Sequence, residues 1–127
     1  MGRKRASADP GITGTYEIST GTAEVVQDEF RDGAYILNVN GVPSSHIVLG
    51  EPEELEFEYM RWIAAAVERL NTQPANKLRV THLGGAGCSL PRYFASKLPG
   101  SRHTVVELDT KLGELVRTLF DVPRSPT

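Results

Sequence analysis

The segment Gly-Gly-Ala-Gly at residues 84–87 constrains the fold more than any other part of the chain. It directly follows an apolar run at residues 78–83, which predicts a short strand. Two residues later, helical spacing over residues 90–98 and Pro91 in the first turn predict a helix. A glycine turn between a strand and a helix predicts a loop that can approach a ligand closely.

The order of elements repeats after this loop. Residues 103–108 predict a second strand, and residues 110–119 predict a second helix. Alternating strands and helices with short connections favour parallel strands joined by crossovers. We therefore expect residues 51–127 to form the first half of a Rossmann-like parallel sheet with helices.

The upstream part of the chain has a different period. Between residues 14 and 50, apolar side chains alternate with polar ones, as in strands with one buried face. Asp32-Gly33 and Asn40-Gly41 are typical of tight hairpin turns. This pattern predicts an N-terminal antiparallel β-meander, which makes the whole chain an α/β protein. Residues 1–13 are interpreted as a flexible tail.

A helix is predicted from Pro52 to about Leu70, with glutamates in its first turns where the helix dipole favours them. Apolar residues recur at helical spacing, so we expect their face to be buried. They are Leu55, Tyr59, Trp62, Ile63, Ala66, Val67 and Leu70.

The candidate nucleoside site combines the glycine loop with Glu107 at the end of the second strand. An acidic residue about 20 positions beyond such a loop holds ribose hydroxyls in nucleoside-binding α/β folds. The predicted contacts are Gly84, Gly85, Ala86, Gly87, Glu107 and Leu108. A dinucleotide site is disfavoured because Leu90 stands where its fingerprint requires a third glycine. A purely structural turn beside an exposed glutamate stays open as an alternative.

Several neighbouring residues allow two interpretations. Asp109 is interpreted as a helix N-cap rather than as a ligand. His82 is either a core histidine or a member of the site, and Cys88 is either a buried spectator or an acidified thiol. His46 and His103 have no Cys or carboxylate grouping around them in sequence, so no metal site is predicted.

Composition limits the partners. With 14 basic and 16 acidic residues the net charge is -2, so neither nucleic acid nor an anionic membrane is indicated. No apolar run reaches the roughly 20 residues needed to span a bilayer. The one cysteine excludes an internal disulfide, and a cytoplasmic location is expected. A homodimer is considered possible.

Four segments together resemble the spermidine synthases, or polyamine aminopropyltransferases, from about residue 16 to residue 120. Residues 37–44 stand in the place of a Leu-x-Leu-Asp-Gly-x-x-Gln segment, and Glu53-Glu54 leads to residues 57–60 in the place of a Tyr-His-Glu-Met helix start. Residues 84–89, followed by Arg92, are similar to a Gly-Gly-Gly-Asp-Gly-Gly loop followed by Arg. Residues 106–109 match a Val-Glu-Ile-Asp strand end.

The chain departs from this family's pattern at several positions. Asn40 replaces Asp, Ser44 replaces Gln, Glu58-Tyr59 replaces His-Glu, and Gly87 replaces the loop Asp. The resemblance is therefore stronger for the nucleoside half of the site than for the amine half, and it indicates a divergent branch.

The resemblance implies transfer of an aminopropyl group from decarboxylated S-adenosylmethionine to a small amine or polyamine, without a metal. It assigns substrate contacts to Asn40, Ser44, Glu54 and Glu58. It places the catalytic base beyond Thr127, so the chain is interpreted as C-terminally truncated. The alternatives are a methyltransferase that uses S-adenosylmethionine itself and a non-catalytic nucleoside-binding remnant.

Overall fold

The computed structural model describes residues 11–120 of the 127-residue chain. Residues 1–10 of the predicted tail lie outside this range. Residues 121–127, which belong to the predicted Rossmann-like domain, also lie outside it. The elements are β1(Gly14–Ile18), β2(Gly21–Gln27), β3(Ala34–Val39), β4(Val42–Val48), α1(Glu58–Leu70), the short 3-10 helix η2(Ala75–Lys77), β5(Arg79–Leu83), α2(Ser89–Lys97), β6(Arg102–Val106) and α3(Thr110–Phe120).

Strands β1 to β4 form an antiparallel sheet in sequence order, as the alternation of side chains predicts. Asn40 and Gly41 form the two-residue turn between β3 and β4, with φ angles of 52° and 82°. The turn predicted at Asp32-Gly33 is instead a longer connection over residues 28–33. This connection begins at Asp28, whose carboxylate accepts hydrogen bonds from the backbone N–H of Phe30 and from His46 Nε2.

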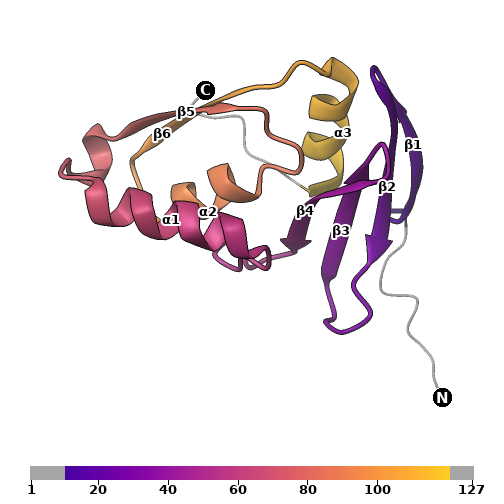
Figure 1. Cartoon of the computed structure of the whole chain (residues 1–127), viewed down its shortest axis with the longest axis horizontal. Helices are drawn as coiled ribbons and strands as arrows, with labels where there is room; N and C mark the ends of the chain where they lie inside the picture. The colour runs from indigo at the N-terminus through magenta and orange to yellow at the C-terminus, as the bar shows by residue number, and fades with distance from the viewer. Residues whose placement is uncertain (1–10, 121–127) are drawn as a thin grey trace.

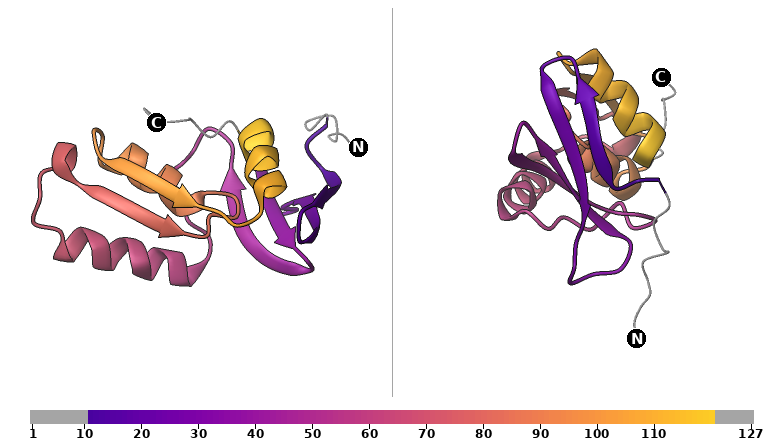
Figure 2. Two further views of the ribbon diagram at one scale, coloured as in Figure 1. Left: turned by 90° about the horizontal axis from the view of Figure 1, so that it is seen from above. Right: turned by 90° about the vertical axis from the view of Figure 1, so that its right-hand side faces the viewer.

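The main hydrophobic core lies between this sheet and α3. Its buried residues are Ile18, Ala23, Val25, Tyr35, Leu37 and Ile47 from the strands and Leu112, Val116 and Phe120 from the helix. Figure 1 shows the four-stranded sheet at one end of the molecule, the parallel strands at the other, and α3 between them. The same helix packs beside β1 and β2 in the right-hand view of Figure 2.

Strands β5 and β6 are parallel and pair in register from Arg79↔Arg102 to Leu83↔Val106. Helix α2 connects them, and its Phe94, 1% exposed, packs against His82 and His103 on one face of the pair. Within residues 11–120, β5 pairs with β6 along one edge only. Figure 1 shows α1 and α2 on the same side of the β5–β6 pair.

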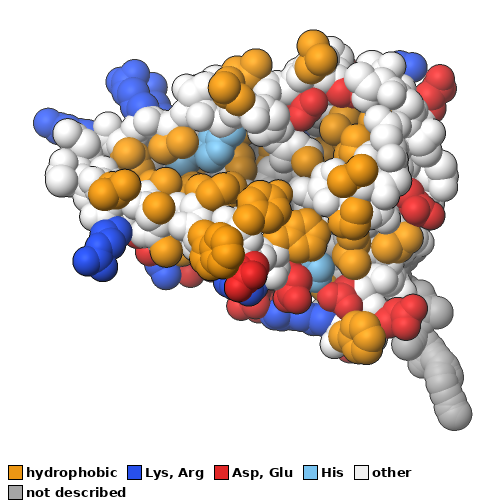
Figure 3. All heavy atoms as spheres, in the orientation of Figure 1, with side chains coloured by type: hydrophobic (Ala, Val, Ile, Leu, Met, Phe, Trp, Pro, Cys, Tyr) orange, Lys and Arg blue, Asp and Glu red, His pale blue; other side chains and the backbone are white. Residues whose placement is uncertain are grey.

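Helix α1 differs from its prediction in two ways. It begins at Glu58 rather than at Pro52, and its buried residues are Met60 and Ala64. The face expected to be buried is largely open to solvent: Tyr59 is 51% exposed, Trp62 65% and Leu70 78%. Figure 3 shows apolar side chains gathered over this helix. The prediction of a buried face is therefore wrong, because the buried side of α1 is the one that carries Met60 and Ala64.

Candidate functional site

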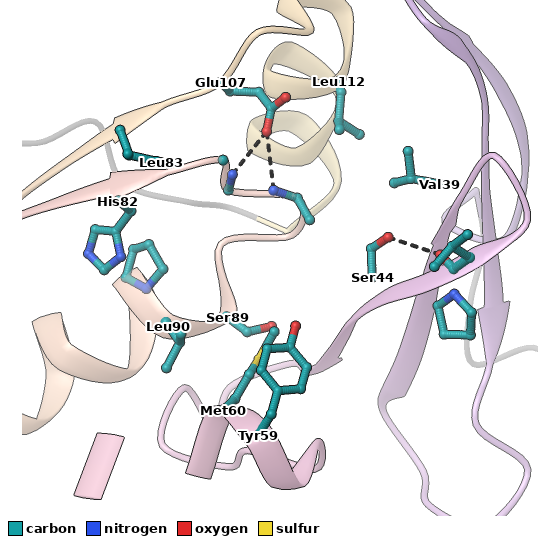
Figure 4. Close-up of a pocket in the computed structure, with 16 residues that line it drawn as sticks. Val39, Ser44, Tyr59, Met60, His82, Leu83, Ser89, Leu90, Glu107 and Leu112 are labelled. Carbon is teal, nitrogen blue, oxygen red and sulfur yellow. Dashed lines mark hydrogen bonds between the residues drawn. The ribbon is translucent and has the colours of Figure 1, made fainter. Parts of the chain in front are cut away.

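A hollow of about 550 Å³ lies where the two sheets meet. It is lined by the ends of β3 and β4, the start of α1, the end of β5, the glycine loop, the start of α2, and the segment from β6 to α3. Most of the lining is apolar, and the polar side chains are those of Ser44, Tyr59, His82, Ser89 and Glu107 (Figure 4). An apolar hollow with a few polar groups is the usual form of a small-molecule site.

The glycine loop follows β5 with an unusual backbone. Gly84, Ala86 and Cys88 have positive φ angles of 82°, 44° and 61°. The loop is held in this form because Gly84 N–H donates to the Val106 carbonyl at 2.7 Å and Cys88 N–H donates to the Gly85 carbonyl at 2.6 Å. Positive φ at two non-glycine residues costs free energy, and such strain is concentrated at functional sites.

Two of the glycines are required by packing inside the protein. A Cβ at Gly85 would lie 2.5 Å from Val105 Cγ1, and a Cβ at Gly87 would lie 2.7 Å from Ile47 Cδ1. At Gly84, by contrast, a Cβ would meet no atom within 4 Å. Packing inside the protein therefore does not require a glycine at position 84, which lines the hollow.

Glu107 lies beside the loop and faces the hollow (Figure 4). Its Oε1 accepts hydrogen bonds from the backbone N–H groups of Gly85 at 2.9 Å and Ala86 at 3.3 Å, and Oε2 accepts from Asp109 N–H at 3.1 Å. A carboxylate has about four acceptor positions, so lone-pair capacity remains after these three bonds. The backbone thus fixes the carboxylate while leaving it able to accept from a ligand hydroxyl.

The antiparallel sheet supports the loop from its other side. Ser45 Oγ accepts from Gly87 N–H at 2.9 Å, and Ser89 Oγ donates to the His46 carbonyl at 3.1 Å. Both serines are buried. These two bonds hold the start of α2 against β4, and they set the position of the loop relative to Ser44 in the hollow.

Asp109 connects β6 and α3 to the hairpin between β1 and β2. Its Oδ1 accepts from Leu112 N–H at 2.9 Å, which confirms the predicted N-cap. Its carboxylate also accepts from Ser19 N–H and from the N–H and hydroxyl of Thr20. Burial alone raises the pKa of Asp109, but the bonds from Leu112, Thr20 and Ser19 outweigh it and lower the pKa below its usual range.

The predicted site residues separate into two groups. The loop residues Gly84–Ala86, Glu107 and Ser44 line the hollow. Gly87 and the predicted contacts Leu108, Asn40, Glu54 and Glu58 are not among its lining residues. Leu108 is 89% exposed, and Glu54 pairs with Arg31 at 2.8 Å beside a second, more acidic hollow.

Asn40 has a structural contact. Its Oδ1 accepts from Thr22 N–H at 2.9 Å, and its Nδ2 donates to the Thr20 carbonyl, so the side chain ties two hairpins together. A Cβ at Gly21 would overlap this Asn40 side chain. The side chain of Asn40, the residue that replaces Asp in the family pattern, therefore bonds to the backbone of the β1–β2 hairpin.

Sequence reasoning did not assign Tyr59, Met60 or Ser45 to the site. Tyr59 and Met60 lie in the first turn of α1 and line the hollow. Their position in the motif at the helix start could have assigned them to the site. Ser45 accepts a hydrogen bond from the loop, 42 residues away, and the sequence gives no indication of that contact.

Cys88 is partly buried. Burial first, and then Glu107, raises the pKa of its thiol, which favours the spectator interpretation.

Within the described residues 11–120, no group of three or more His, Cys, Asp or Glu side chains is arranged to hold a metal ion. None of the helices in that range has the length and apolar character needed to cross a membrane.

The comparisons with known proteins identify one solved structure of high similarity. The crystal structure of a probable spermidine synthase from Corynebacterium glutamicum ATCC 13032 superposes with a TM-score of 0.83 and is 52% identical over 91% of this chain. The match covers 42% of that protein's chain. No protein-family model and no curated protein matches the sequence.

Fold and site together define an α/β protein in which an antiparallel sheet precedes part of a methyltransferase-like parallel sheet. The chain resembles this probable spermidine synthase in sequence and in structure, and the resemblance predicted from its motifs is confirmed. It spans less than half the length of the protein that it matches.

Proposed function

We propose that the hollow binds the nucleoside part of decarboxylated S-adenosylmethionine. The observation that carries this proposal is the carboxylate of Glu107, held by Gly85 and Ala86 N–H groups at the wall of the hollow with acceptor capacity to spare. Vicinal ribose hydroxyls are two donors at adjacent positions, which a carboxylate with two oxygens can accept together. The apolar lining suits an adenine ring and a thioether chain.

We further propose that this chain serves an aminopropyltransferase reaction. In that reaction the amine nitrogen forms a bond to the aminopropyl carbon attached to sulfur. The carbon–sulfur bond breaks, its electron pair neutralises the sulfonium to a thioether, and the nitrogen loses a proton to a base. The similarity to a probable spermidine synthase supports this reaction class.

In this proposal the described residues contribute binding and orientation. Glu107 fixes the nucleoside. The bond from Gly87 N–H to Ser45 Oγ and the bond from Ser89 Oγ to the His46 carbonyl fix the loop against β4. Fixing the donor carbon relative to the attacking amine lowers the entropic part of the barrier. Ser44, on the wall of the hollow, is the predicted substrate contact that the geometry supports best.

The test is calorimetric titration with methylthioadenosine, S-adenosylmethionine and its decarboxylated form. We expect Glu107→Gln to weaken methylthioadenosine binding roughly ten-fold or more, since hydrogen bonds to a charged group contribute about 1.5–3 kcal/mol. Glu114→Gln, on α3 away from the hollow, is the matched control and should bind normally. Equal affinity of the Glu107→Gln variant and the wild type, with the fold intact, would contradict the proposal.

Tighter binding of S-adenosylmethionine than of its decarboxylated form would favour the methyltransferase alternative.

A further inference from the structure

Three polar side chains form a continuous hydrogen-bonded line beside Phe94. His82 Nε2 lies 3.0 Å from His103 Nδ1, and His103 Nε2 lies 2.9 Å from Ser101 Oγ. Ser101 Oγ lies 2.6 Å from the carbonyl oxygen of Leu98. The line begins on the wall of the hollow, which His82 lines, and ends at the backbone after α2.

The Leu98 carbonyl determines the direction of every proton in this line. A carbonyl can only accept, so the Ser101 hydroxyl donates to it, and Ser101 Oγ accepts from His103 Nε2–H. A neutral His103 then has a lone pair on Nδ1, which accepts from His82 Nε2–H. His82 therefore carries its own lone pair on Nδ1.

Both imidazoles are neutral near pH 7. Burial first, and then the neighbouring His103, lowers the pKa of His82 to about 4, and burial lowers the pKa of His103. Phe94 stacks on His103 with an interplanar angle of 10°, which keeps the ring in the orientation that the line requires. The side chain of His82 has no hydrogen-bond partner within residues 11–120 other than His103.

We propose that His82 Nδ1 accepts a hydrogen bond from the primary amine of the ligand bound in the hollow. This inference rests on the proposed function. His82 and Glu107 lie on the wall of one hollow, at the ends of adjacent parallel strands (Figure 4). Glu107 is committed to the nucleoside hydroxyls, and a neutral acceptor receives an ammonium N–H without repelling its charge. Ser101 and His103 act as positioning residues, because they fix which nitrogen of His82 keeps the lone pair.

The test compares two ligands that differ only in the amine: 5′-propylthio-5′-deoxyadenosine and its 3-aminopropyl counterpart. We expect the wild-type chain to bind the aminopropyl compound about ten-fold more tightly, as one hydrogen bond to a charged donor implies. In His82→Phe this preference for the aminopropyl compound over the propyl compound should fall to near one. Thr81→Val, on the opposite face of β5, is the matched control and should keep the preference.

Nitrogen-15 NMR gives a second readout, which is measured on the wild-type chain. The chain has three histidines, so the imidazole signals can be assigned from single-residue variants. We expect an unprotonated Nδ1 at His82 in the free protein, a shift of that signal with the aminopropyl compound only, and a mixed tautomer population in Ser101→Ala.

The outcomes separate the two proposals. If neither compound binds, the proposed function fails. If both bind equally to the wild type, if His82→Phe keeps the preference, or if the free protein carries the proton on His82 Nδ1, the role assigned to His82 is overturned.

Discussion

Gly87 donates its backbone N–H to Ser45 Oγ at 2.9 Å, joining the glycine loop to β4 across 42 positions of sequence. Ser45 is completely buried. The next residue of the same strand, His46, accepts from Ser89 through its carbonyl. The antiparallel sheet is therefore a direct support of the candidate site, because β4 contacts the loop that lines the hollow.

Removing the Ser45 hydroxyl should destabilise the protein and weaken ligand binding together. Ser45→Ala leaves the Gly87 N–H buried without its acceptor, which costs about 1–3 kcal/mol. Urea unfolding measures the stability, and methylthioadenosine titration measures the site. Ser44→Ala is the matched control for stability, since Ser44 Oγ only donates to the nearby Val42 carbonyl. Equal unfolding midpoints for the two variants would contradict the role given to Ser45.

The glycines of the loop should respond to alanine in different ways. Gly87→Ala forces a Cβ to within 2.7 Å of Ile47 Cδ1 and 2.8 Å of Ser45 Cβ, and overpacking of this kind costs about 1–3 kcal/mol. Gly84→Ala meets no protein atom within 4 Å and carries only the cost of a positive φ of 82°. We expect Gly87→Ala to lower the melting temperature more than Gly84→Ala. The reverse order would show that backbone conformation outweighs packing at this loop.

The sequence was sufficient to predict the elements that local chemistry determines. The Asn-Gly pair at residues 40 and 41 predicts a tight turn, and both residues have positive φ angles. Asp109 predicts the start of α3, and its carboxylate caps that helix. The parallel pairing of β5 with β6 follows from a short crossover through α2. In each case, residues close together in sequence decide the structure.

Features that depend on distant partners were not predictable in this way. The spacing of Tyr59, Trp62 and Leu70 correctly shows that they share a helix face, but spacing cannot reveal whether another element covers that face. The predicted start of α1 is too early because the prediction assigns the glutamates before it to the first turns of the helix. Glu51 and Glu54 instead lie before α1 and pair with Arg31. The contact between Ser45 and Gly87 likewise exists only in three dimensions.

The exposure of α1 gives a prediction for the chain's single tryptophan. Trp62 is 65% exposed, so acrylamide should quench its fluorescence nearly as strongly as that of N-acetyltryptophanamide in dilute solution. Because the surrounding face is apolar, quenching should decrease as protein concentration rises if copies associate through it. Weak quenching at every dilution would contradict the exposed position of α1.

The acid stability of the protein should depend on Asp109. The pKa of this carboxyl is lowered in the folded state from its usual 3.8, because the bonds from Leu112, Thr20 and Ser19 favour the ionised form over the opposing effect of burial. A group whose pKa falls on folding stabilises the protein above its unfolded pKa and loses that contribution as pH falls toward the folded value. The Asp109 contribution should therefore be complete above about pH 5 and disappear progressively below about pH 4.

Urea unfolding midpoints measured between pH 7 and pH 2 test this assignment. We expect Asp109→Asn to be less stable than the wild type at pH 7, because an amide loses the charge and offers one acceptor oxygen where Leu112, Ser19 and Thr20 use two. The gap between the two proteins should narrow as the pH falls below 4, since the wild-type carboxyl then becomes neutral as well. Asp32→Asn, an exposed change in the β2–β3 connection, should follow the wild-type curve. A constant gap across the whole pH range would show that Asp109 acts through shape alone, and its charge would then have no part in holding the β1–β2 hairpin against α3.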